Sequence, residues 1–332
     1  MKRLIDLLPG VSMSVGDVTR TLRHMWDVEA GGDDHRMDFR ASQMNLILHF
    51  GLETSADEAE AHFQTAIAFA QTYPSRIIVL CPVNETVGED EFEGKLFSQC
   101  YIGRHLRDVC CCEALILGYS PEQSDFLESQ VSLWLEADLP IYHWLHRVPV
   151  DRISGFYLGF LKRCRKVLFD GAVEGDAYRT IEWPDPDRIA DFSHARTLPL
   201  RQHLGQFISR FPPSELIEGL IALEFRYTPA VERMAWHLMR WHRQSLGRCF
   251  SKPAEADDLT WSFEPLGEDD TEHCLCVNWA FADPDRFLTM EYNRSRKSGL
   301  VRASLPPGTL EHPLHIEPLS PVETLGEAMF FG

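Results

Sequence analysis

The sequence carries too little positive charge to suit a partner that is rich in phosphate. Its 332 residues include 32 lysines and arginines against 50 aspartates and glutamates, which gives a formal net charge of −18. Such a chain is repelled by the backbone of nucleic acids and by anionic membrane surfaces. We therefore expect no nucleic acid and no membrane as partners, but a protein surface, with basic patches as the best complement.

Long apolar runs are also missing. No apolar segment reaches the roughly 18 residues that a membrane-spanning helix needs. The first residues, MKRLIDLLPGVSMSVGDV, are interrupted by Pro9, Gly10 and Asp17, which is not typical of a secretory signal. The nine cysteines are irregularly spaced between positions 81 and 276, which favours free thiols in a reducing compartment. These features predict a cytoplasmic protein.

Motifs that hold phosphates or activate nucleophiles are absent. No G-x-G-x-x-G follows any expected strand, so a dinucleotide-binding fold is not indicated. The stretch GEDEFEGKL (88–96) has five residues between its glycines, and Leu96 stands where a phosphate-binding loop needs Ser or Thr. GYSPE (118–122) lacks the second glycine of a nucleophile elbow. We accordingly predict no catalytic residue, no metal and no cofactor.

Three consecutive cysteines raise the question of a metal or redox site. Because side chains alternate along a strand, Cys110 and Cys112 should point to one face and Cys111 to the other. Structural zinc needs four ligands, usually two C-x-x-C-like pairs, and none is present. Burial in a strand is the favoured interpretation, also for Cys274 and Cys276, and a redox role for these five cysteines is the alternative.

The first half of the chain alternates expected strands with expected helices. This alternation predicts an α/β N-terminal domain built on a layered sheet. Strands are expected at 43–51, 75–83, 96–103, 110–118, 139–146 and 165–171, and helices at 55–73, 120–138 and 151–164.

The order changes in the second half, which predicts an α+β C-terminal domain with an antiparallel meander. Helices are expected at 196–211 and 229–247, and strands at 215–227, 259–266, 273–281, 286–293, 299–304 and 312–317. The polar, proline-rich stretch 172–195 is expected to be a linker or seam, so that the domains span 1–171 and 196–332.

Histidines and tryptophans are the remaining candidates for a site. HWLH places His143 and His146 on opposite faces of a strand, which does not suit shared ligation. In the helix 229–247, Trp236 and Trp241 either belong to the core or anchor an interface, since Trp and Arg are frequent at binding hot spots.

The order of several segments resembles the family of the glucose-6-phosphate dehydrogenase assembly protein, OpcA. The resemblance spans about residues 40–250, and its joint order is more specific than any single motif. The stretches that carry it are YPSRIIVL (73–80), CCCEALILGY (110–119), ADLPIYHWLH (137–146), CRKVLFDG (164–171), DFSHARTLPLRQHLGQFI (191–208) and AVERMAWHLMRW (230–241).

The resemblance implies a non-catalytic protein that binds glucose-6-phosphate dehydrogenase and favours its active oligomer. Such a role supports the oxidative pentose phosphate pathway and its NADPH supply. Trp144 stands where many members have a second aromatic beside it, and Arg196 and Arg201 are retained while His194 and Leu200 replace two aromatics.

Five residues are the candidates for binding a partner or an anion: Trp144, Arg196, Arg201, Trp236 and Trp241. Packing in the core is the alternative for Trp144. The two arginines either pair with nearby carboxylates or form an anion pocket, because a guanidinium matches carboxylate and phosphate. Such a pocket keeps open a second function, a sugar-phosphate-binding protein or an unrecognised enzyme.

Overall fold

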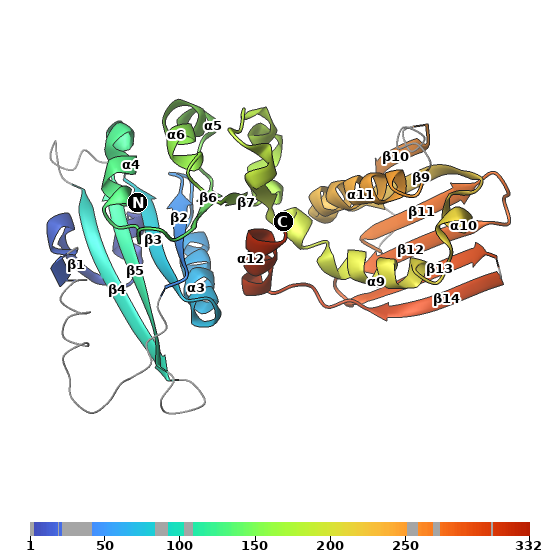
Figure 1. Ribbon diagram of the computed structural model, residues 1–332, viewed down its shortest axis with the longest axis horizontal. Helices are drawn as coiled ribbons and strands as arrows, with labels where there is room; N and C mark the ends of the chain where they lie inside the picture. The colour runs from blue at the N-terminus through green and yellow to red at the C-terminus, as the bar shows by residue number, and fades with distance from the viewer. Residues whose placement is uncertain are drawn as a thin grey trace. The chain divides into compact units, whose positions relative to one another are not determined.

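The protein was analysed as a computed structural model that describes residues 3–18, 20–21, 42–83, 92–102, 109–250, 258–267, 273–306 and 308–332. The chain divides into two compact units (Figure 1). Unit 1 comprises Met1–Asp191 together with Pro321–Gly332, and unit 2 comprises Phe192–Ser320. Mixed α/β structure with two sheets is what the sequence pattern predicted.

Unit 1 is built around an eight-stranded sheet with the order β1-β4-β5-β3-β2-β6-β7-β8. The strands are β1 (Val11–Ser14), β2 (Met44–Phe50), β3 (Ser75–Pro82), β4 (Glu93–Ile102), β5 (Val109–Tyr119), β6 (Ile141–His146), β7 (Lys166–Phe169) and β8 (Ile189–Asp191).

The helices and helical turns of unit 1 are short apart from α3. They include α1 (Leu4–Leu7), α3 (Ala56–Thr72), η1 (Pro121–Gln123), α4 (Ser124–Ser132), α5 (Val150–Arg152), the π-helical turn η2 (Ile153–Tyr157), α6 (Leu158–Leu161), α7 (Gly171–Glu174), η3 (Gly175–Thr180), η4 (Pro186–Arg188) and α12 (Pro321–Phe330).

Six strands of this sheet run parallel: β5, β3, β2, β6, β7 and β8. Numbered among themselves in chain order, they stand in the order 3-2-1-4-5-6. This is the strand order of dinucleotide-binding folds, in which ligands bind where the order reverses, at the carboxyl ends of the first and fourth strands. The topology is therefore present although the glycine fingerprint is not.

Helices cover both faces of the sheet. Ile47 and Leu145 point to the face covered by α4 and the segment 150–161, with which they form one core cluster. Tyr142 and Trp144 point to the opposite face, where their rings meet Phe330 of α12 and His62 of α3. Every residue of β2 is buried, as expected for a parallel strand between two helical layers.

Unit 2 contains a six-stranded sheet with the order β10-β9-β11-β12-β13-β14. Its elements are α8 (Phe192–Ala195), α9 (Leu198–Ile208), α10 (Pro213–Ile217), β9 (Leu220–Tyr227), η5 (Pro229–Val231), α11 (Glu232–Gly247), β10 (Thr260–Pro265), β11 (Leu275–Phe281), β12 (Phe287–Asn293), β13 (Ser298–Leu305) and β14 (Gly308–His315). The run β11 to β14 is an antiparallel meander.

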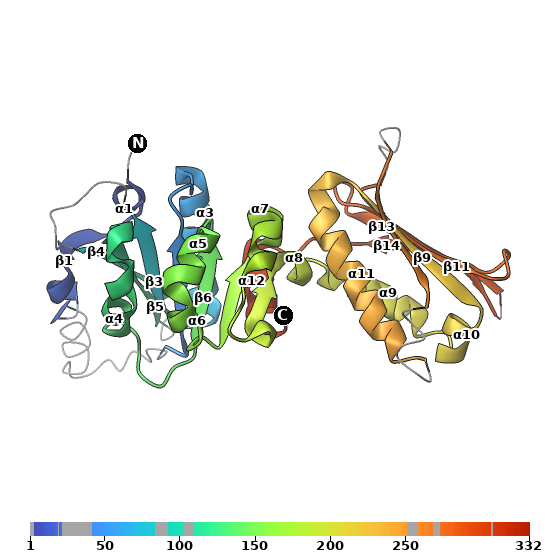
Figure 2. The same ribbon diagram turned by 90° about the horizontal axis from the view of Figure 1, so that it is seen from above.

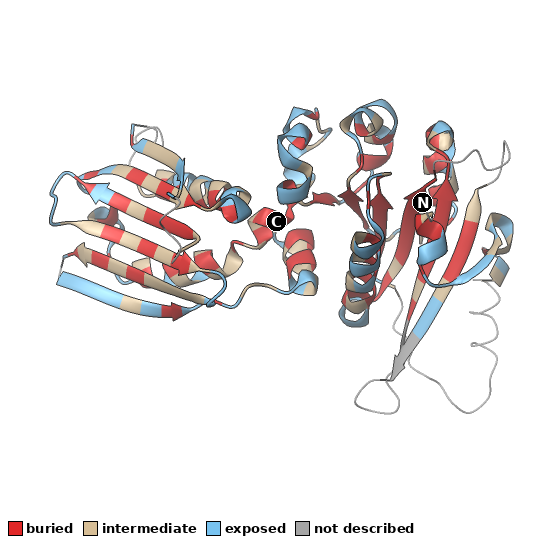
Figure 3. Ribbon diagram, turned by 180° about the vertical axis from the view of Figure 1, so that it is seen from behind, coloured by how far each residue is buried: buried red, intermediate tan, exposed pale blue. Residues whose placement is uncertain are grey.

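Only one face of this second sheet carries helices among the described residues of unit 2 (Figure 2). Apolar residues of α9 and α11 pack with alternate residues of the strands into one core. The strands consequently alternate, as in β12, where buried and partly exposed residues follow one another (Figure 3). The opposite face carries polar pairs such as Arg302 and Glu291, 2.8 Å apart.

The structure differs from the sequence-based boundaries at several places. The segment expected as a seam contains β8, which pairs with β7 in the sheet of unit 1. The last helix, α12, belongs to unit 1, where Leu325 and Met329 are buried. The expected strand 215–227 begins only at Leu220, because prolines favour the short helix α10 and Gly219 turns the chain with a φ of +72°.

The helix expected at 120–138 is also shorter than predicted. After the 3-10 turn η1, α4 ends at Ser132, and the following turn contains Asp138 with a φ of +66°, a conformation that ends a helix. No helix of the described residues is long and apolar enough to cross a membrane.

Candidate functional site

The switch point of the unit 1 sheet is the position at which the strand order reverses and at which doubly wound folds bind their ligands. It lies between β2 and β6, whose following loops touch each other directly. Gly51 donates its backbone N–H to the carbonyl of His146, and a Cβ at position 51 would come within 1.6 Å of the Arg147 carbonyl oxygen. Only glycine fits there, so Gly51 allows the loops after β2 and β6 to lie in contact.

The N-terminus of α3 is the position where a doubly wound fold binds phosphate, because free backbone N–H groups point outward there. Here it is capped from within the chain. Ser55 Oγ accepts from the N–H of Glu58 at 3.3 Å, and the Glu58 carboxylate accepts from the N–H of Ser55 at 2.9 Å. This reciprocal capping box leaves a carboxylate where an anionic ligand would have to bind.

Arg147, in the loop after β6, fixes that carboxylate. Its Nη2 and Nε donate to Glu58 at 2.7 Å and 3.0 Å. The hydrogen bonds from Arg147 lower the pKa of Glu58 to about 2. The backbone N–H of Arg147 donates to Glu174 at 2.7 Å, and burial raises the pKa of Glu174 to about 7. Hydrogen bonds thus connect the loop after β6 with the loop after β2, the N-terminus of α3 and α7.

Histidines pair across elements on both faces of the sheet. His146 Nδ1 lies 3.2 Å from Nε2 of His62 on the α3 side. On the other face, His143 Nε2 lies 3.2 Å from Nδ1 of His49. The prediction that His143 and His146 point to opposite faces is confirmed, but these partners are too distant in sequence to be predicted from spacing.

The second pair extends into a buried polar chain. His49 Nε2 lies 2.7 Å from the Tyr119 hydroxyl, which lies 3.3 Å from the hydroxyl of Tyr157 in η2. That hydroxyl is in turn 2.9 Å from Ser124 Oγ at the start of α4. Burial lowers the pKa of His49 to about 3, so its imidazole is neutral at physiological pH. We interpret the chain as a hydrogen-bonded part of the core.

The five residues predicted to bind a partner or an anion are dispersed. Trp144 is only 4% exposed and packs under α3, which fits its packing interpretation. Arg201 donates from Nε to Thr197 Oγ1 at 3.0 Å, one helical turn away. Trp241 is partly buried against the core of unit 2. Arg196 and Trp236 lie in the two surface features described next.

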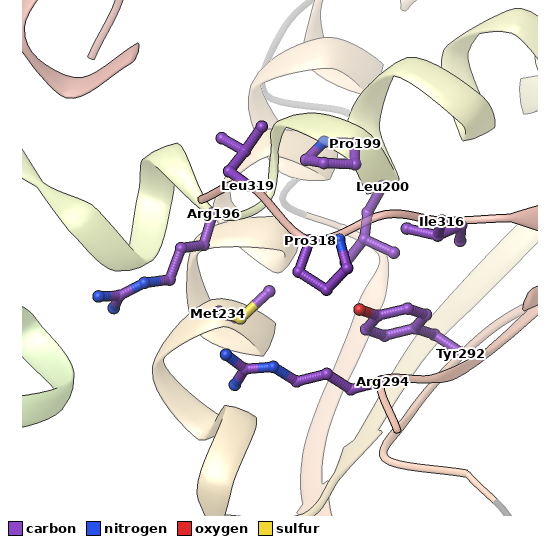
Figure 4. A pocket seen from close by; sticks show the side chains of 9 residues that line it. All are labelled: Arg196, Pro199, Leu200, Met234, Tyr292, Arg294, Ile316, Pro318 and Leu319. Carbon is purple, nitrogen blue, oxygen red and sulfur yellow. The ribbon is translucent and has the colours of Figure 1, made fainter. Parts of the chain in front are cut away.

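A small pocket within unit 2 combines Arg196 with an arginine that the sequence did not single out. Its empty volume is about 370 Å³, part of which is open solvent. Figure 4 shows Arg196 and Arg294 around Met234, with both guanidinium groups directed to the same side. Pro199, Leu200, Ile316, Pro318 and Leu319 form an apolar wall, and Tyr292 completes the lining.

Several arginines on the outward side of α11 lie over tryptophan rings. The guanidinium carbons of Arg233 and Arg240 lie 4.8 Å and 5.1 Å from the centre of the Trp236 ring. That of Arg243 lies 4.9 Å from the centre of the Trp261 ring in β10. These distances are within the range of cation–π contacts.

The cysteines give little support to a redox or metal site. Cys112 and Cys276 are buried thiols, and Cys274 is a half-buried thiol. Burial raises the pKa of Cys274, which disfavours the reactive thiolate. The side chains of Cys110 and Cys111 lie outside the described residues. Among the described residues, no group of three or more potential ligands could hold a metal ion.

Taken together, unit 1 is a doubly wound α/β domain with the topology of dinucleotide-binding folds and a phosphate position closed by its own Glu58. Residues 66–183 match the family described as glucose-6-phosphate dehydrogenase subunit N-terminal domain. For residues 66–183 this match confirms the resemblance to the OpcA family found in the sequence.

Two further comparisons add little. Among solved structures, the chain is similar to a glucose-6-phosphate 1-dehydrogenase from Mycobacterium avium, with 9% identity, 87% of each chain covered and a TM-score of 0.42. A likeness at this level supports no conclusion about fold or function. No curated protein matches the sequence.

Proposed function

We propose that the protein is a non-catalytic partner of glucose-6-phosphate dehydrogenase that binds it and favours its active oligomer. The observation that carries the proposal is the family match over residues 66–183, whose description names that dehydrogenase. The match includes β3, β4, β5, β6 and β7 of the unit 1 sheet, and β2 lies outside it.

The closed switch point supports the non-catalytic part of the proposal. A dinucleotide would need the α3 N-terminus for its phosphates, and there the Glu58 carboxylate accepts hydrogen bonds from both Ser55 and Arg147. An added anion would have to displace the Glu58 carboxylate, which Ser55 and Arg147 hold in place. The fold is retained while its usual ligand position is filled.

The proposed mechanism is thermodynamic linkage. A protein that binds the active oligomer of an enzyme more tightly than the inactive form shifts the equilibrium by the difference in binding free energy. A coupling of about 1–3 kcal/mol is typical and corresponds to a change of about 5- to 150-fold in an equilibrium constant. No catalytic group on this chain is needed for such an effect.

A mixing experiment tests the proposal. The rate of NADPH formation from glucose 6-phosphate is measured with the dehydrogenase alone, with this protein alone and with both. We expect a higher rate in the mixture than with the dehydrogenase alone, and none with this protein alone. Turnover by this protein alone, or a mixture no faster than the dehydrogenase, would contradict the proposal.

The pocket with Arg196 and Arg294 favours a second candidate, the binding of a small phosphorylated ligand. Two guanidinium groups on the same side of an apolar wall suit one anionic group attached to a carbon skeleton. Calorimetric titration with glucose 6-phosphate tests this function. Binding that Arg294→Gln weakens would support it, and no heat of binding would remove it.

A further inference from the structure

The outward side of α11 has a charge opposite to that of the whole chain. The helix contains Arg233, Arg240 and Arg243, with Arg248 at its C-cap, and its only acidic residue is Glu232. The whole chain carries a formal charge of −18. Because salt screens charges beyond about 8 Å at physiological ionic strength, a docked surface responds mainly to the local arginines. The expectation of a basic partner surface, based on net charge, does not hold for this helix.

The two exposed arginines on this side are held in place by aromatic rings. Arg240 and Arg243 are exposed and lie three residues apart, which puts them side by side on the helix surface. Arg240 lies over the ring of Trp236, and Arg243 lies over that of Trp261. Trp261 in turn stacks on the buried Phe225 at 6.4 Å between ring centres, which ties it to the core.

This arrangement lowers the cost of binding an acidic surface. A free arginine side chain loses rotamer freedom when it is bound, whereas a guanidinium already stacked on a ring has lost part of it before binding. The outer edge of a stacked guanidinium still carries N–H groups that can donate to a carboxylate. Trp and Arg are also the residue types most enriched where interfaces gain their energy.

We infer that this side of α11, with Arg240 and Arg243 stacked on Trp236 and Trp261, is the surface that contacts an acidic patch of the dehydrogenase. The inference rests on the proposed function and adds to it the contact surface and the chemistry of the partner's side. The contacts on α11 are observations separate from the family match, since α11 lies outside residues 66–183.

The test compares the wild type with the double variant Arg240→Glu/Arg243→Glu in binding to the dehydrogenase. We expect the dissociation constant to rise at least about tenfold, because each change replaces an attraction by a repulsion. The wild-type affinity should also fall as salt is raised from about 50 to about 300 mM, and that of the variant should not. Arg240→Lys/Arg243→Lys keeps the charge, loses the planar stacking and should give an intermediate affinity.

Arg210→Glu is the matched control. Arg210 is an exposed arginine of unit 2 that lies 5.6 Å from the centre of the Phe207 ring, so it makes the same kind of contact elsewhere on the unit. Its affinity for the dehydrogenase should equal that of the wild type. Thermal unfolding shows whether each variant is folded. If Arg240→Glu/Arg243→Glu is not folded, the binding of Arg240→Gln/Arg243→Gln to the dehydrogenase is measured in its place.

The outcomes separate the two proposals. Absence of wild-type binding removes the proposed function together with this inference. Binding of the wild type and the double variant with equal affinity removes the inference alone. If the double variant loses binding to a duplex DNA oligonucleotide but not to the dehydrogenase, the surface serves nucleic acid and the inference is wrong.

Discussion

The two sheets of this protein are covered differently. In β2 of unit 1 every residue is buried, whereas in β12 of unit 2 buried and partly exposed residues alternate. The first pattern results from helices on both faces, and the second from helices on one face among the described residues of unit 2. Unit 1 pairs Glu58 with Arg147 at its switch point, and unit 2 carries the stacked Arg240 and Arg243 at its surface. The family match lies in unit 1, whereas the surface proposed to contact the dehydrogenase lies in unit 2.

The most damaging change is expected at the switch point of unit 1. Gly51→Ala would place a methyl group 1.6 Å from the Arg147 carbonyl oxygen, so the loops after β2 and β6 would have to separate. We expect the free energy of unfolding to fall by about 3 kcal/mol or more, measured by urea denaturation.

Gly155→Ala is the control for that substitution. Nothing lies within 4 Å of an added Cβ at Gly155, which is in η2 of the same unit. Its stability should stay within about 1 kcal/mol of the wild type or rise, since alanine favours helix more than glycine does. If both substitutions lowered the free energy of unfolding equally, the close contact between Gly51 and Arg147 would not be the cause of the loss.

The next largest effect is expected in α12, which covers one face of the unit 1 sheet. Leu325 is 1% exposed, and Phe331 beside the same helix is 77% exposed. Leu325→Ala should lower the free energy of unfolding by about 2–4 kcal/mol, because it removes buried methyl groups and leaves a cavity. Phe331→Ala should change it by less than about 0.5 kcal/mol. A small effect at Leu325 would mean that α12 is not part of the core of unit 1.

The smallest effect concerns pH. Burial lowers the pKa of His49 to about 3 from the ordinary value of 6.5. Below about pH 6.5 the unfolded chain therefore binds a proton that the folded chain does not, and stability falls as pH falls. One such group costs about 1.4 kcal/mol per pH unit, hence about 2 kcal/mol between about pH 6.5 and about pH 5.

His49→Gln should reduce the loss of stability over that pH range by about this amount, as measured by urea denaturation at both values. If His49→Gln has the same pH dependence as the wild type, His49 titrates normally and its burial is wrong.

The sequence predicted most elements because local signals were consistent. The Ser55 capping box and Pro74 bound α3, and β-branched runs mark β2 and β3. The sheet order could not be predicted, since it depends on which strands lie side by side and not on local pattern. The glycine fingerprint that usually accompanies this order is missing, and Glu58 and Arg147 occupy the phosphate position.

The candidate site was predicted only in part. Trp236 was selected by residue type, but its stacking with Arg233 and Arg240 follows from helical spacing and was recognisable in the sequence. The stack of Arg243 on Trp261 joins a helix and a strand and required the structure. The same holds for Arg294, which follows β12 and lines the same pocket as Arg196.

Sedimentation velocity of the dehydrogenase at a fixed concentration, with increasing amounts of this protein, tests the central proposal most directly. We predict a new, faster-sedimenting species that contains both chains and grows until a fixed ratio is reached. Two boundaries that sediment independently at every ratio, each at the rate of the isolated protein, would contradict it.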